Sequence, residues 1–143
     1  MLLAITCMGA VNDGRSAVAS DDSGLLVIGG LSMNTLLATN MNVGLAAELH
    51  TANPGSGKTV IQAVGQTETT VTNSVKLLET WRASAQLKND DAEYIDNILK
   101  ALRLVSNQAA ALRKWVENED RNALTEYMDQ RAQVASLIKK MLE

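Results

Sequence analysis

The sequence has little of the material from which catalytic and cofactor sites are built. Its 143 residues include one Cys, one His, one Pro, no Phe and four Trp or Tyr residues in all. A single Cys excludes an intramolecular disulfide and the Cys-x-x-Cys-His sequence that attaches haem covalently. A single His excludes the paired Glu-x-x-His motifs of di-metal bundles. We therefore expect a protein that is not an enzyme, with no catalytic residues, no cofactor and no metal.

Composition and charge are those of a single globular domain. Apolar residues make up 46% of the chain and charged residues 20%, with a net charge of −3 and an isoelectric point near 5.2. This is enough apolar material for a core, so a disordered chain is not expected. The length fits one domain. The acidic balance argues against a nucleic-acid partner.

The N-terminus has the pattern of an export signal. Residues 2–11 form an apolar run, and Ala17-Val18-Ala19 before Ser20 is a sequence that signal peptidase accepts. We expect residues 1–19 to be a leader, residues 20–143 to be one domain, and the protein to be periplasmic or secreted. No Lys or Arg precedes the apolar run, so a cytoplasmic protein with an ordinary N-terminal segment is the alternative.

Four segments have helical spacing of apolar residues, at about 23–50, 59–88, 95–116 and 124–142. Short connections between long helices favour antiparallel neighbours. We predict an all-α fold, an antiparallel up-down-up-down four-helix bundle after the leader. The third segment has the most regular stripe, made of Ile95, Ile98, Leu102, Val105, Ala109, Leu112 and Val116. The fourth has a stripe made of Leu124, Met128, Ala135, Ile138 and Leu142.

The first segment admits two structures. Its apolar residues recur every four positions, at Met33, Leu37, Met41, Leu45 and Leu49. Residues 25–28 are a short apolar run between glycines, which a strand could also use. We predict a helix because no second convincing strand is present to pair with this run. No transmembrane span is expected, since Asn34, Asn40, Asn42 and Glu48 are costly in lipid.

Residues 52–59, Ala-Asn-Pro-Gly-Ser-Gly-Lys-Thr, are similar to a phosphate-binding P-loop. A P-loop follows a buried strand and needs a parallel sheet, and neither is expected here. The first position is also Ala52 rather than Gly. We therefore interpret the segment as a turn between two helices, with no role for Lys58 in nucleotide binding.

Basic residues are missing from the first third of the chain. No Lys or Arg occurs between Ser16 and Gly57, whereas residues 91–143 hold 17 charged side chains. An exposed helix face normally carries charges. The outer face of the first helix would instead carry four small uncharged residues at i, i+4 spacing, which allow close helix packing: Asn34, Ala38, Asn42 and Ala46.

These residues are the candidates for an interface, together with Trp81 and Trp115, which adjoin apolar stripes. The expected function is that of a small exported helical protein acting through protein contacts, as an adaptor, inhibitor or assembly subunit. Its partner would be another protein or a second copy, bound through the first helix. A peripheral contact with a membrane surface is a further option. The alternative function is a ligand-binding or sensing bundle with a pocket between helices.

Overall fold

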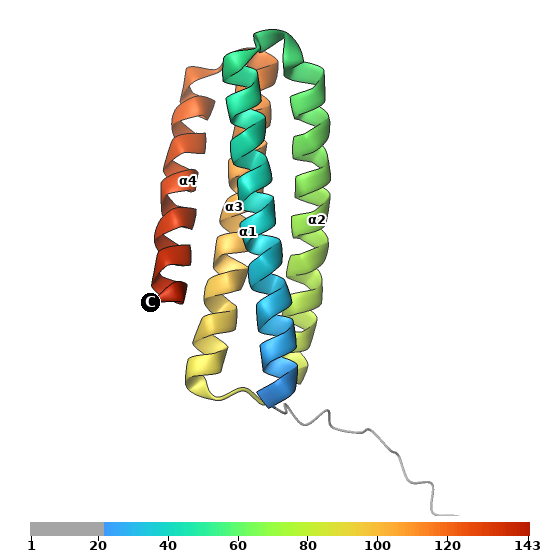
Figure 1. Ribbon diagram of the computed structural model, residues 1–143, viewed down its shortest axis with the longest axis vertical. Helices are drawn as coiled ribbons and strands as arrows, with labels where there is room; N and C mark the ends of the chain where they lie inside the picture. Colours follow the sequence, from blue (N-terminus) through green and yellow to red (C-terminus); the bar gives the residue numbers. More distant parts are fainter. Residues whose placement is uncertain (1–21) are drawn as a thin grey trace, which may run out of the picture.

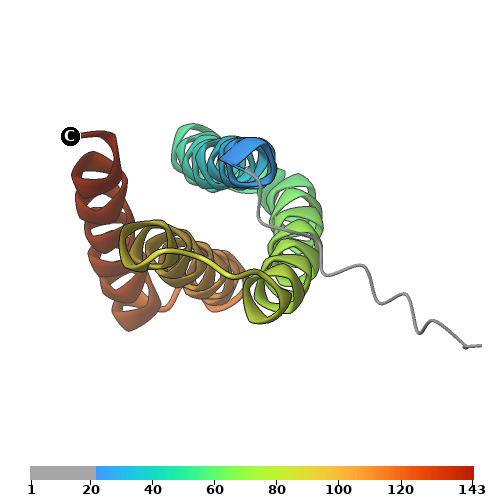
Figure 2. The ribbon, with the colours of Figure 1, turned by 90° about the horizontal axis from the view of Figure 1, so that it is seen from below.

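The computed structural model describes residues 22–143, which form four long helices and one short 3-10 turn. The helices are α1 (Asp22–Ala52), α2 (Gly57–Ser84), α3 (Asn89–Asn118) and α4 (Arg121–Leu142), with η1 (Pro54–Ser56) between the first two. They run alternately up and down, and neighbours in sequence are neighbours in space (Figures 1 and 2). The predicted all-α antiparallel bundle is confirmed. The predicted leader and its cleavage site lie outside the described residues.

α3 is the central helix, because it packs against each of the other three. Its buried stripe contains the sequence-predicted residues from Ile95 to Leu112, and both Leu102 and Leu112 are completely buried. Ion pairs add to two of its contacts. Arg82 binds Asp96 at 3.2 Å between α2 and α3, and Lys140 binds Glu93 at 3.1 Å between α3 and α4.

α1 is helical throughout, including residues 25–28, but its core face is not the stripe that recurs every four positions. A step of four residues turns a helix by about 400°, so such a stripe drifts around the axis by about 40° at each step. Met33 is therefore buried, whereas Met41, Leu45 and Leu49 are exposed. The face that packs inward is made of Met33, Leu36, Val43, Ala46 and Ala47.

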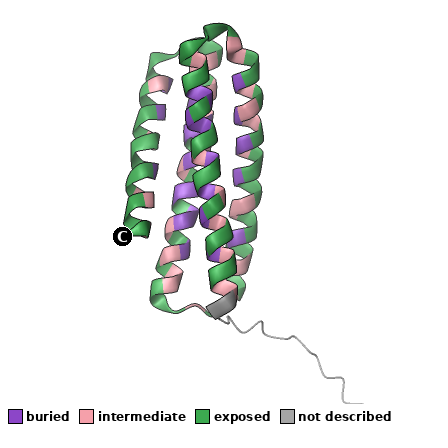
Figure 3. Cartoon of the chain, in the orientation of Figure 1, coloured by how far each residue is buried: buried purple, intermediate pink, exposed green. Residues whose placement is uncertain are grey.

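The sequence-predicted stripe of α4 also needs correction. Met128, Ala135 and Leu142 are exposed, and the buried residues are Ala123, Tyr127 and Val134. α4 has extensive contact with α3 only, so one narrow face is covered and much of the helix is exposed (Figure 3). Leu124, Leu137, Ile138 and Met141 are half-buried and pack against the core.

The helix junctions show how local chemistry ends each element. Asn53 closes the first junction by accepting a hydrogen bond from the Gly55 amide at 3.1 Å. Asp120 caps α4 by accepting one from the Asn122 amide at 2.8 Å. α3 begins earlier than its apolar stripe, and Asp90 and Asp91 lie in its first turn, where acids stabilise the helix dipole.

Replacing Leu102 by Ala should lower the free energy of unfolding by about 2–5 kcal/mol, because it leaves a cavity beside the central helix. Denaturant unfolding followed by circular dichroism measures the change. Leu77→Ala is the matched control, since Leu77 is 72% exposed and its loss should cost under about 0.5 kcal/mol. Equal losses in the two variants would contradict this packing.

Gln108 of α3 is completely buried, and neither atom of its amide has a hydrogen-bond partner among the described residues. A buried amide without partners destabilises the folded state by about 1–3 kcal/mol.

Replacing Gln108 by Met keeps the length of the side chain and removes its polar atoms. We expect the free energy of unfolding to rise by about 1–3 kcal/mol, measured by denaturant unfolding. Gln133→Met on the exposed side of α4 is the control and should change little. A less stable Gln108→Met variant would show that the amide makes favourable interactions in solution.

Candidate interaction surface

The side of α1 that faces away from the core is a continuous apolar surface. We call this surface the outer face of α1; its central residues are Val27, Leu31, Asn34, Ala38, Met41 and Leu45, all of them exposed. Val27 and Leu31 are 58% and 60% exposed, and Met41 and Leu45 are 60% and 54% exposed. Of the ten large hydrophobic residues that are exposed in the described chain, seven belong to α1. Isolated exposed apolar residues are common in soluble proteins, whereas large contiguous apolar patches are typical of interaction sites.

The spacing of these residues keeps them on one line. From Val27 to Leu45 the steps are four, three, four, three and four residues, which average 3.6. An α-helix has 3.6 residues per turn, so the row runs parallel to the axis without drifting. This is the spacing with which one helix packs along another.

The outer face carries no charge. Between Gly24 and Ala47 the helix has no Asp, Glu, Lys or Arg, and the first charged residue after that stretch is Glu48. The ion pairs of the bundle lie mainly between α2 and α3 and between α3 and α4. α1 takes part in one pair, Glu48 with Arg131, whose closest atoms are 4.0 Å apart. This face therefore has no charged side chain that would favour its exposure to water.

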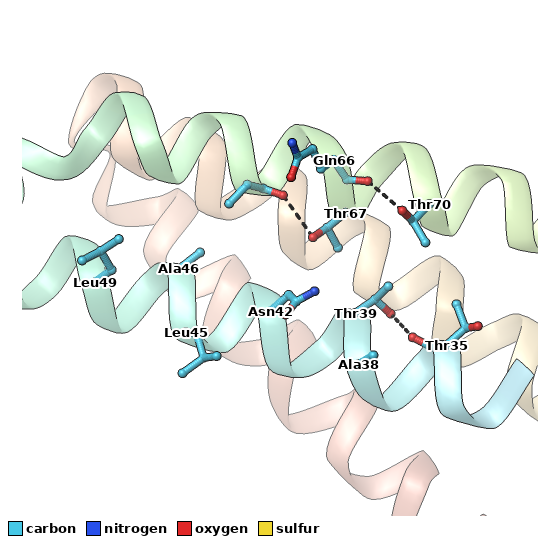
Figure 4. Close-up of a pocket in the computed structure, with 11 residues that line it drawn as sticks. Thr35, Ala38, Thr39, Asn42, Leu45, Ala46, Leu49, Gln66, Thr67 and Thr70 are labelled. Carbon is cyan, nitrogen blue, oxygen red and sulfur yellow. Dashed lines mark hydrogen bonds between the residues drawn. The ribbon is translucent and has the colours of Figure 1, made fainter. Parts of the chain in front are cut away.

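One edge of the outer face borders a groove between α1 and α2 with a volume of about 610 Å³ (Figure 4). Its lining is uncharged and consists mostly of small residues: Thr35, Ala38, Thr39, Asn42, Leu45, Ala46, Leu49, Ala63, Gln66, Thr67 and Thr70. Small side chains on both walls allow another helix to approach closely.

The threonines of the groove already use their hydroxyl protons. Thr39 donates to the Thr35 carbonyl at 2.7 Å, and Thr70 donates to the Gln66 carbonyl at 3.0 Å, each one turn earlier in its own helix. Thr35 and Thr67 do the same. The side chains of Asn42 and Gln66 make no hydrogen bond within the described chain, so these two amides are the groups that can recognise a partner's polar atoms.

Three of the four small residues singled out by the sequence lie on the exposed side of α1: Asn34, Ala38 and Asn42. Ala46 does not, since it is only 6% exposed and belongs to the core. The cause is again the drift of an i, i+4 line, which has turned by about 120° between Asn34 and Ala46. The sequence reasoning missed Val27, Leu31, Met41 and Leu45, which steps of alternately four and three residues would have found.

The two tryptophans lie at different ends of the bundle. Trp81 is in the last turns of α2 and lines a pocket of about 210 Å³ that it shares with Leu31 and Leu77. It therefore borders the outer face of α1 at the end where α1 begins. Trp115 is near the end of α3 and makes an edge-to-face contact with His50, with ring centroids 5.0 Å apart. Trp115 thus lies away from the outer face.

A second opening lies between α1 and α4, which have no extensive contact with each other. Trp115 lines a pocket of about 310 Å³ there, together with Leu124, Tyr127 and Met128. Arg131 lies at this pocket and at a neighbouring one of about 260 Å³, and its guanidinium donates to the Tyr127 hydroxyl at 3.2 Å.

The P-loop-like segment is a helix-to-helix turn in the structure, as predicted. α1 continues to Ala52 where a P-loop would have a strand, and Lys58 lies in the first turn of α2. No glycine in residues 22–143 has a positive φ, which the anion-binding nest of a P-loop requires.

Comparisons with protein-family models, with curated proteins and with solved structures gave no match.

α1 passes a simple test for a membrane-spanning helix on length and composition. An 18-residue stretch within Gly24–Ala52 has a mean hydropathy of 1.3, and 22% of this stretch is buried inside the bundle. Core helices and signal sequences pass the same test. Asn34, Asn40 and Asn42 are costly in the hydrocarbon of a bilayer.

Proposed function

We propose that this protein acts through protein–protein contact, as a non-enzymatic helical adaptor or assembly subunit, and that the outer face of α1 is the contact surface. The observation that carries the proposal is the charge-free row of exposed apolar residues from Val27 to Leu45. Removing apolar surface from water is favourable by about 25 cal/mol for each Å², before the entropic cost of association is subtracted. Leaving a row of this length in water has a corresponding cost.

The polar groups of the surface suit a protein partner. Asn34 and Asn42 stand among the apolar residues, and Gln66 lies across the groove. Amide side chains pair with backbone and side-chain groups of another helix, and such pairs fix which partner binds and in which register.

A photo-cross-linking side chain placed at Ala38 should give discrete protein adducts in the native host. Ala38 is at the centre of the outer face, and the reagent reacts only with molecules held close to it. Ala132 is the matched control, an exposed alanine on α4. Adducts are resolved by electrophoresis and identified by mass spectrometry.

The control position should give no adduct. If Ala38 gave no protein adduct, or gave the same adducts as Ala132, the outer face of α1 would not be the contact surface and the proposed function would be wrong.

A second candidate function is the binding of a small apolar ligand in the opening between α1 and α4. The pocket of about 310 Å³ supports it, because aromatic and aliphatic side chains line it and a guanidinium lies at its edge. Such a site suits a ligand with an apolar body and an anionic group, since Arg131 can donate to a carboxylate or sulfonate.

Thr51 lines this pocket and is exposed, so Thr51→Phe should fill the pocket without changing the core. We expect the variant to bind anilinonaphthalene sulfonate about tenfold more weakly, measured by fluorescence titration. Thr80→Phe is the control, because Thr80 is exposed on α2 and has the same bond to a carbonyl one turn earlier. Equal binding by the two variants would remove the support for a ligand site.

A further inference from the structure

We infer that the occupant of the outer face of α1 is a second copy of this chain, packed antiparallel to the first around a two-fold axis. The inference rests on the proposed function and names its partner. In this arrangement α1 of one copy runs alongside α1 of the other, and the axis passes between Asn34 and Ala38.

The row of exposed residues is self-complementary when it is reversed. With the axis at this point, Val27 lies opposite Leu45 of the other copy, Leu31 opposite Met41, and Asn34 opposite Ala38. Every residue of the row therefore has a counterpart. Alternating steps of four and three residues are the spacing of the a and d positions of a heptad repeat. In the reversed pairing each a position faces a d position of the other copy, as in antiparallel coiled coils.

Size also fits within each pair. Leu31 and Met41 are both long, and the small Ala38 leaves space for the amide of Asn34. Asn34 is the only polar residue among the six central ones. A single asparagine in an apolar seam is known to fix register and oligomeric state at some cost in stability. Around the two-fold axis the two Asn34 side chains come from adjacent layers and can pair with each other.

The charge and the length of the row are those of a homotypic contact. The positions that flank the row include Leu37, Asn42 and Leu49 and carry no charge before Glu48, so two copies do not repel each other. The row spans five helical turns, about 27 Å. The flanking leucines Leu37 and Leu49 are 39% and 42% exposed, so they widen the apolar surface that a second copy can cover.

A membrane surface fits this face less well. Helices that lie in a lipid interface carry Lys or Arg beside their apolar face and often Trp at its edge. α1 has no Lys, Arg or Trp in its 31 residues, and Asn34 would enter the hydrocarbon. A second identical face offers Asn34 a polar partner, which hydrocarbon does not.

The test combines two charged substitutions in the purified full-length chain, with mass measured by sedimentation equilibrium. The wild type should have twice the 15.3 kDa mass of one chain at micromolar concentration. Leu31→Lys alone and Met41→Glu alone should each weaken association about 100-fold, because each places an unpaired charge in the seam. The double variant Leu31→Lys, Met41→Glu should be a dimer again, since each Lys then lies opposite a Glu of the other copy.

Only antiparallel pairing predicts this rescue. In parallel pairing Lys would face Lys and Glu would face Glu, and within one helix the two positions are about 15 Å apart, too far to pair. Ala132→Arg on α4 is the control and should remain a dimer. Circular dichroism checks that every variant is folded.

A monomeric wild type, or a double variant as weakly associated as the single ones, would overturn the inference. So would wild-type protein that is monomeric and binds vesicles of neutral phosphatidylcholine. The proposed function and the dimer are tested separately. If the wild type is a monomer and position 38 still cross-links to a different protein in cells, the dimer is wrong and the proposed contact surface stands.

Discussion

Burial of α3 against the three other helices holds the bundle together. This packing also decides which faces of α1 and α4 remain uncovered. α3 contacts α1, α2 and α4, whereas α1 and α4 have no extensive contact with each other. Its stripe from Ile95 to Leu112 is buried nearly throughout. Because α3 is covered on several sides, α1 and α4 each give one face to it and keep other faces free.

The consequence is greatest for α1, which is apolar on both its inner and its outer side. An amphipathic helix normally places charges opposite its core face, and α2, α3 and α4 do so. α1 places Val27, Leu31, Met41 and Leu45 there. A helix that is apolar all round is expected to be buried all round. Within the described chain only the inner side of α1 is covered, and this is the basis of our proposal that another molecule covers the outer face.

The fold was predictable from the sequence because α3 alternates steps of three and four residues, a pattern that defines one face without ambiguity. Leu102 and Leu112 could be assigned to the core for this reason. α1 was assigned less well, because Leu37, Met41 and Leu45 recur every four residues and drift around the helix. The same drift placed Ala46 on the wrong side. The predicted stripe of α4 does not drift, but it lies one residue away from the buried set of Ala123, Tyr127 and Val134. Which apolar face of α1 turns inward depends on its contacts with α2 and α3, and the sequence of α1 alone does not determine these contacts.

The exposed side of α1 was predictable in part, since Asn34 and Ala38 were assigned to it and Val27, Leu31, Met41 and Leu45 were not. The absence of Lys and Arg between Ser16 and Gly57 indicated a helix without the usual surface charges. The structure then identified which side of this helix is exposed. Trp115 adjoins an apolar stripe in the sequence, and in the structure it is half-buried and packs against the core. Only the tertiary structure brings it into contact with His50 and into one pocket with Tyr127.

The outer face of α1 and the pocket at Trp115 can be occupied at the same time. The outer face is centred on Ala38, and its residues Met41 and Leu45 also line the smaller pocket at Arg131. The pocket at Trp115 is lined by a later part of α1, from Ala47 to Ala52. Glu48 is the first charge after the apolar row, and its ion pair with Arg131 marks the border between the two regions. A helix packed along the outer face would leave the pocket lined by Trp115 open to solvent. The proposed assembly through the outer face and the proposed ligand site at Trp115 therefore do not exclude each other.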